Sequence, residues 1–196
     1  MTLEPLDLRS SALIVWDMQL GIAGRASNRD EIVPRIKVLL AQYRARGLPV
    51  VYSQHTTPPA AWINPAMSRS MVRRGVPPGA FRLAPGVPEW AILPELAPLP
   101  EELVLTKTTP SFFVGTPLEG MLRFRKVETV VLTGVSTEAG IMGTARHAAT
   151  LGFHPLVVED AVGSMTREGN DEALRVLRSI ADVESTEQLV ARLPPP

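Results

Sequence analysis

Apolar residues along the chain form short continuous runs that alternate with longer segments in which they recur every three or four positions. Continuous runs of this length predict buried strands, and the wider spacing predicts helices that bury one face. We expect strands at 12–17, 48–53, 102–107, 129–134, 154–160 and 181–185. We expect helices at 30–46, 116–125, 138–151, 168–180 and 186–192, with Asp30 as the N-cap of the first and Gly47 at its end.

This alternation predicts one α/β domain over residues 1–196. Apolar strands joined by helices form a parallel sheet covered on both faces, so we expect a three-layer α/β/α fold with a six-stranded parallel sheet. The connection 55–101 is too long for an ordinary loop, and such segments often cover a site. With its aromatic residues Trp62 and Trp90, this long apolar loop is expected to contact a second copy of the chain.

Composition narrows the range of partners. Of 196 residues, 45% are hydrophobic, and 20 basic residues balance 20 acidic ones. Zero net charge gives no electrostatic reason to expect nucleic acid or an anionic membrane as partner. No apolar run reaches the ~18 residues of a membrane span. We expect a small-molecule substrate and a cytoplasmic location, because the first residues do not resemble a signal peptide.

Metal and redox chemistry also find little support in the sequence. The chain contains no cysteine, which excludes disulfides and thiolate metal sites. Its three histidines, His55, His147 and His154, lack metal-ligand spacing. We therefore expect no metal and no cofactor.

Polar residues cluster where the predicted strands end, and in parallel α/β sheets ligands bind outside these carboxyl ends. The residues there are Asp17, Gln19, Ser53, Gln54, His55, Lys107, the turn 134–140, Glu159 and Asp160. A carboxylate beside a lysine can act as general acid or base, while the ammonium stabilises developing negative charge. Taken singly, Asp17 is explained as a turn former, Lys107 as a solvated charge, and Glu159 and Asp160 as caps. Only the convergence of Asp17 and Lys107 at one edge favours a catalytic role for these two residues.

Three segments resemble motifs of the isochorismatase-like, or cysteine hydrolase, superfamily, in the family's order and within roughly residues 8–190. They are ALIVWDMQ (12–19), LTKTTPSFFVGTPLEGML (105–122) and GVSTEAGIMGTARHA (134–148). The resemblance implies that Asp17 and Lys107 are catalytic and that Gly140 stands where most members have the nucleophilic cysteine. It also implies a cis peptide before Ser136 that shapes an oxyanion pocket. The residues expected to contact substrate are Gln19, His55, Phe112, Val135, Ser136 and Thr137.

Glycine at position 140 closes the thiol route of the amidohydrolase members. The isochorismatase branch also has glycine there, and it hydrolyses a vinyl ether without a covalent intermediate: the aspartate protonates the enol ether carbon, and water adds to the resulting oxocarbenium ion. The resemblance implies that the missing side chain leaves room for substrate beside Asp17. The turn 136–139 nevertheless follows the amidohydrolase version, and His55 stands where isochorismatases have a substrate-binding glutamine.

Three functions remain open from the sequence. The first is hydrolysis of a small molecule, such as a carboxylated enol ether, with Asp17 as general acid/base. The second is amide or imide hydrolysis by Asp17-activated water, or with Ser136 or Thr137 as nucleophile. The third is a catalytically silent relative that serves as a binding or assembly module, although the retention of both Asp17 and Lys107 argues against it. In each case we expect a homo-oligomer.

Overall fold

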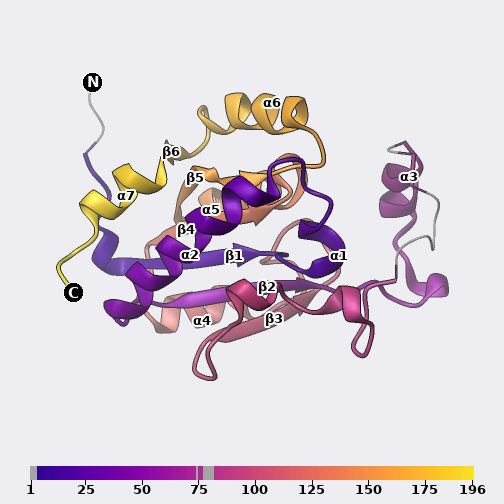
Figure 1. Cartoon of the computed structure of the whole chain (residues 1–196), viewed down its shortest axis with the longest axis horizontal. Coiled ribbons are helices and arrows are strands. Elements are labelled where there is room, and N and C mark those ends of the chain that lie inside the picture. Colours follow the sequence, from indigo (N-terminus) through magenta and orange to yellow (C-terminus); the bar gives the residue numbers. More distant parts are fainter. Residues whose placement is uncertain (1–3, 74, 77–81) are drawn as a thin grey trace.

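A six-stranded parallel sheet forms the centre of the computed structural model, which describes residues 4–73, 75–76 and 82–196 (Figure 1). The strands are β1 (Ser11–Trp16), β2 (Val50–His55), β3 (Leu103–Lys107), β4 (Thr129–Val135), β5 (His154–Gly163) and β6 (Asp182–Glu184). Their order across the sheet is β3-β2-β1-β4-β5-β6, and every neighbouring pair is parallel. The predicted fold class is confirmed, and each predicted strand is present.

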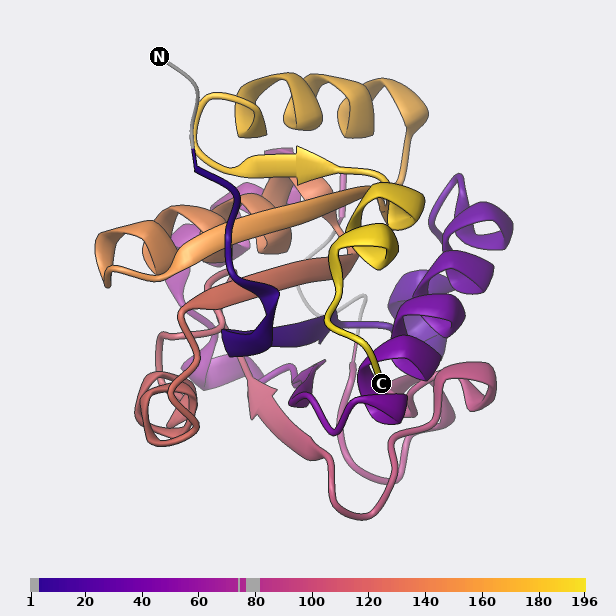
Figure 2. The ribbon, with the colours of Figure 1, turned by 90° about the vertical axis from the view of Figure 1, so that its left-hand side faces the viewer.

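Helices cover both faces of the sheet. Those in the described part of the chain are α1 (Leu20–Ala23), α2 (Arg29–Ala45), α3 (Pro65–Arg73), α4 (Leu118–Phe124), α5 (Met142–Thr150), α6 (Arg167–Leu177) and α7 (Thr186–Arg192). Residues of α2 and α7 share one hydrophobic cluster with the sheet, and residues of α4, α5 and α6 share the other. Figure 2 shows α2 and α7 on the opposite side of the sheet from α5.

The central strand β1 connects the two layers. All six of its residues are buried. Leu13 and Val15 belong to the cluster with α2 and α7, while Ile14 and Trp16 point to the opposite cluster, as the alternation of side chains along a strand requires. A strand buried on both faces must be apolar throughout, which explains the continuous apolar run in the sequence.

Helix α2 begins earlier than predicted, and its N-cap is a different residue. Asn28 occupies the N-cap position, whereas Asp30 lies within the first turn, where its carboxylate still favours the positive end of the helix. The Asn28 amide makes no capping bond and instead donates to the carbonyl of Val162 at 3.1 Å. The prediction of Asp30 as N-cap is therefore wrong. Gly47 ends the helix region with a φ of 61°, as expected.

Strand β5 is longer than predicted, and this moves two acidic residues away from the strand end. The strand continues to Gly163 through an irregularity in its pairing with β4. Glu159 pairs with Arg178, and Asp160 accepts bonds from the backbone N–H and hydroxyl of Thr186 at 2.7 and 2.8 Å, at the start of α7. The prediction that Glu159 and Asp160 lie at the carboxyl edge is wrong; Asp160 instead binds Thr186, the first residue of α7, whose N-cap is Ser185.

The long connection between β2 and β3 contains regular structure. It includes α3 and three 3-10 turns, at Ala60–Trp62, Pro88–Trp90 and Pro94–Leu96. Figure 1 shows α3 standing apart from the body of the molecule, beyond the carboxyl ends of the strands. The chain then returns to the sheet, where Ile92 forms an antiparallel bridge with Gln19. In the described residues, no helix is long and apolar enough to cross a membrane.

Candidate active site

The candidate site lies at the point where the sheet changes its direction of winding. The central strand β1 has β2 on one side and β4 on the other, and in open parallel sheets ligands bind outside the carboxyl ends at such a switch point. Asp17 follows β1, His55 ends β2, Lys107 ends β3, and Ser136 follows β4. The fold therefore brings together four segments that are far apart in the sequence.

Asp17 is buried, and both of its carboxylate oxygens have partners. The residue is 5% exposed and has a φ of 44°, a left-handed conformation that is uncommon for residues other than glycine and occurs often at functional sites. Ser53 Oγ donates to Oδ1 at 2.6 Å, and Lys107 Nζ donates to Oδ2 at 2.6 Å. The same serine oxygen accepts the Asp17 backbone N–H at 3.0 Å. These bonds fix the orientation of the carboxylate.

Lys107 completes a buried ion pair. It ends β3, two strands away from β1, and its side chain reaches across β2 to Asp17. The residue is 4% exposed. Burial lowers the pKa of the Lys107 ammonium from its usual value, while the charge and the hydrogen bond of Asp17 oppose this shift. The Nζ atom also lies 4.1 Å from the centroid of the Trp16 ring, in a cation–π contact.

His55 lies beside Lys107 on the neighbouring strand, in register with it. Burial and the nearby charge of Lys107 lower the pKa of His55 to about 4, and the charge of Asp17 opposes this shift only in part. The imidazole is therefore neutral near pH 7. A neutral ring presents one donor and one acceptor to a ligand, and it adds no second positive charge to the site.

The side chain of Gln19 links the backbone of β2 to the backbone of the long connection by hydrogen bonds. Its Oε1 accepts the His55 N–H at 2.7 Å, and its Nε2 donates to the carbonyls of His55 at 3.1 Å and Trp90 at 2.8 Å. Gln54 Nε2 donates to the same Trp90 carbonyl at 3.0 Å. Gln19 is fully buried. In this structure it fastens the returning segment of the long connection to β2.

The turn after β4 contains the cis peptide expected between Val135 and Ser136. Val135 is buried and Ser136 is partly exposed. The Thr137 hydroxyl is buried, within hydrogen-bond distance of Gly163 O at 3.0 Å and Asn170 Oδ1 at 2.6 Å. A π-helical turn at Thr137–Ile141 then leads into α5. Of these polar side chains, Ser136 is the one that the structure leaves accessible to a ligand.

Gly140 contacts the central strand so closely that no side chain fits there. A Cβ atom built at this position would lie 2.0 Å from Nε1 and 2.1 Å from Cε2 of Trp16. The expectation that the missing thiol leaves room for substrate is therefore wrong, because the indole fills that space. Phe112 is fully buried and packs edge-to-face against the same indole, with 5.6 Å between ring centroids.

Two contributors to the site were not identified from the sequence. Ser53 was placed at a strand end but given no role, although it holds Asp17. Trp16 was expected only to be part of a buried strand. The sequence feature that could have pointed to its role is the presence of a large aromatic side chain directly before the candidate catalytic aspartate. Of the four arginines of the long connection, Arg69, Arg73 and Arg82 are exposed, and Arg74 lies outside the described residues.

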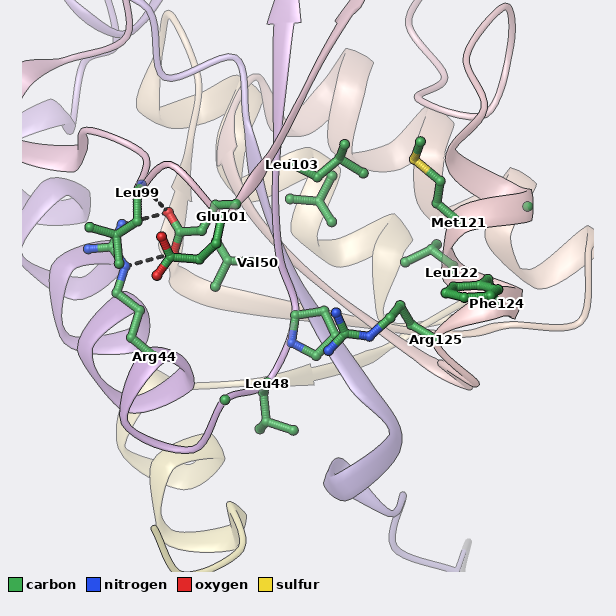
Figure 3. A pocket seen from close by; sticks show the side chains of 15 residues that line it. Arg44, Leu48, Val50, Leu99, Glu101, Leu103, Met121, Leu122, Phe124 and Arg125 are labelled. Atoms are coloured by element: carbon green, nitrogen blue, oxygen red, sulfur yellow. Dashed lines mark hydrogen bonds and ion pairs between the residues drawn. The ribbon is translucent and has the colours of Figure 1, made fainter.

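A cavity of about 530 Å³ lies at the other end of β2 and β3, away from Asp17 (Figure 3). Val50, Leu103, Met121 and Phe124 are among the residues that line it, and Arg44 pairs with Glu102 at its margin at 2.8 Å. The Asp17 site is the better candidate for catalysis, because the buried pair of Asp17 and Lys107 lies there. Among the described residues, no group of His, Asp and Glu side chains could hold a metal ion.

Fold and site together define a parallel α/β protein with a buried aspartate–lysine pair at its switch point. The isochorismatase domain matches residues 11–188, and the chain belongs to the isochorismatase family. The predicted membership of this superfamily is confirmed.

Individual relatives agree with this assignment. The chain is 32% identical to the uncharacterised isochorismatase family protein YecD of Escherichia coli O157:H7, over 96% of this chain and 98% of that protein. It is 31% identical to the ureidoacrylate amidohydrolase RutB of Cronobacter sakazakii, over 77% and 73% of the two chains. An isochorismatase family protein from Burkholderia thailandensis superposes with a TM-score of 0.81 at 30% identity, over 94% of this chain and 95% of that one.

Proposed function

We propose that this chain hydrolyses a small molecule without a covalent enzyme intermediate and that Asp17 is the general acid/base. One observation carries the proposal: Asp17 and Lys107 form a buried pair at the strand ends, while position 140 has neither a thiol nor the space for one. With the covalent route absent, the carboxylate exchanges protons with water or substrate. Lys107 stabilises negative charge that develops beside it.

A carboxylated enol ether is the first candidate substrate. Glycine at position 140 is shared with the vinyl-ether branch that the sequence resembles. In this reaction Asp17 takes up a proton and delivers it to the enol carbon, and water then adds to the oxocarbenium ion. The neutral imidazole of His55 and the partly exposed Ser136 are the polar groups proposed to orient the substrate.

Hydrolysis of an amide or ureido bond is the second candidate. The 31% identity to a protein named as a ureidoacrylate amidohydrolase favours it. Asp17 also accepts both of its side-chain hydrogen bonds in the structure, which is the state in which a carboxylate can remove a proton from water. Thr137 is a poor candidate nucleophile because its hydroxyl is engaged with Gly163 and Asn170.

The two reactions are separated by their products. Purified protein is assayed for pyruvate release from isochorismate and for ammonia release from ureidoacrylate and simple amides. We expect one product, and we expect the Asp17→Asn variant to lose it. If neither assay shows turnover above Asp17→Asn, the hydrolase proposal fails and the catalytically silent alternative is favoured. A buried ion pair costs desolvation free energy, so its retention argues for a catalytic use.

Assembly and location remain predictions. We propose that the chain forms a homo-oligomer through the 60–73 segment, because Trp62 is 80% exposed and none of the residues of α3 is buried. Large exposed aromatic side chains are enriched in such contacts. Trp90 is less available than predicted, since its indole N–H donates to Thr56 at 3.0 Å. The proposed location is the cytoplasm, which fractionation of the source cells tests.

A further inference from the structure

The last residue of β1, Trp16, lies between the candidate catalytic pair and the position of the missing thiol. The residue is 1% exposed. The ammonium of Lys107 lies over its ring, 4.1 Å from the centroid. Its indole nitrogen lies 2.0 Å from the place of a Cβ on Gly140, and Phe112 packs against it edge-to-face. One ring therefore contacts the catalytic lysine and also blocks position 140.

We propose that Trp16 is a positioning residue of the active site, which fills the volume that a nucleophile at position 140 would need and holds the Lys107 ammonium against Asp17. Its effect on turnover rests on the proposed function. Its effects on volume and on the geometry of Lys107 do not, so they can be tested without a known substrate.

The path of the Lys107 side chain explains why it needs such a support. The stem starts at the end of β3 and crosses β2 before the ammonium meets Asp17. Lysine has a flexible four-carbon stem and a charge without directional preference. A flat indole face beneath the ammonium restricts where it can lie, and cation–π attraction is strongest for tryptophan in a desolvated site.

The close approach of Gly140 explains why Trp16 and a nucleophile exclude each other. Real Cβ atoms essentially never approach another atom within 3.0 Å, and the contacted atoms belong to a rigid ring. Lys107 on one side and Phe112 on another hold this ring in place. Because protein interiors are close-packed, the ring cannot move aside without disturbing the catalytic lysine. Glycine at 140 and tryptophan at 16 thus act as a matched pair.

A double-mutant cycle in urea tests the volume claim without any substrate. Gly140→Ala should lower the folding equilibrium constant by roughly 10-fold or more in the wild-type background, because it overpacks the site. In the Trp16→Leu background the same change should have little effect or raise that constant, since alanine also favours a helical turn. Gly120→Ala is the control, because Gly120 lies in α4 and no atom beyond the helix's own backbone lies within 4 Å of its Cβ position. If Trp16→Leu does not fold, Trp16→Phe replaces it.

The geometry of Lys107 is tested by NMR. The chain has three lysines, Lys37, Lys107 and Lys126, so selectively labelled lysine gives few resonances to assign. Protons held over the face of an indole are shifted upfield by its ring current. We expect an upfield Lys107 side-chain signal in the wild type that is lost in Trp16→Leu and unchanged in Phe153→Leu. Phe153 is a buried aromatic residue of the same cluster that lies under Arg123 instead.

Kinetics then separates positioning from simple packing. On the substrate that the product assays identify, Trp16→Leu should lower kcat by about 100-fold, the scale of a misplacement near 1 Å. Trp16→Phe should recover part of that loss because it restores a ring beneath the ammonium, and Phe153→Leu should stay near wild type. An additive mutant cycle, or a Lys107 signal without an upfield shift, overturns the inference. A folded Trp16→Leu variant with wild-type kcat overturns only the claim that Trp16 affects turnover. The role of Asp17 is unaffected by that result, because the Asp17→Asn variant tests it separately.

Discussion

Replacing Lys107 by methionine tests whether the buried ion pair is a genuine electrostatic unit. Methionine has a similar length but no charge, so the carboxylate of Asp17 keeps Ser53 as a donor and loses its ammonium. Both members of the pair are nearly inaccessible to water, with side chains 2% and 7% exposed for Lys107 and Asp17. Removing one partner of a buried pair leaves an uncompensated charge and costs about 3–5 kcal/mol.

The expected loss is large enough to measure in two ways. For a chain of this size it corresponds to a fall in Tm of about 6–20 °C, at about 2–4 °C per kcal/mol. Urea unfolding at pH 7 gives the free energy of unfolding directly. The Asp17→Asn/Lys107→Met double variant has no buried charge at this position, so it should be more stable than Lys107→Met alone.

A matched control separates burial from the mere presence of an ion pair. Arg9 and Asp7 form a pair at 2.8 Å, close to the 2.6 Å of Lys107 and Asp17, but their side chains are 78% and 48% exposed. Arg9→Met should therefore leave the unfolding free energy close to wild type, because solvent screens exposed pairs. If Lys107→Met is as mild as Arg9→Met, or if the double variant is no more stable than Lys107→Met, the description of the pair is wrong.

Three further perturbations follow from the same structure. Native His55 resists protonation until about pH 4 whereas an unfolded histidine binds a proton near pH 6.5, so stability should fall by up to about 3 kcal/mol as pH drops through this window. Urea titrations of His55→Gln should show a shallower fall, and an equal one refutes the assignment. Gly140→Cys should reduce stability and native activity without adding ammonia release beyond that of the wild type. Because the chain has no other cysteine, a thiol reagent reports on this position alone, and a robust gain of amidase activity over the wild type would contradict the account. Trp62→Ser should convert an oligomer to smaller species in sedimentation, and a monomeric wild type at micromolar concentration would contradict the assembly proposal.

The sheet was predictable because its strands are buried on both faces. An apolar run such as 12–17 has no other stable place in a folded domain of this size, and its spacing from the next helix permits a parallel crossover. The cap of α2 and the length of β5 were not predictable in the same way. They depend on contacts between distant segments, such as the Asn28 amide with the Val162 carbonyl, which leave no local signal in the sequence.

The candidate site was predictable to the extent that parallel strands end at one edge. That rule brings Asp17, His55 and Lys107 together without knowledge of any family. The rule does not say which side chains face a ligand, so Gln19 and Thr137, which the structure uses for backbone contacts, could not be separated from the others. Nor could it show that Trp16 fills the space beside Gly140, since that depends on a side-chain conformation.

Turnover by Asp17→Asn is the most direct test of the central claim that Asp17 is the general acid/base. The substitution is nearly isosteric, and urea unfolding and the sedimentation profile confirm that the variant is folded before rates are compared. With the substrate that releases pyruvate or ammonia in the wild type, we predict a loss in kcat of at least about 100-fold, the scale of general acid–base catalysis. A folded Asp17→Asn variant that turns over this substrate at a near-wild-type rate would contradict the account.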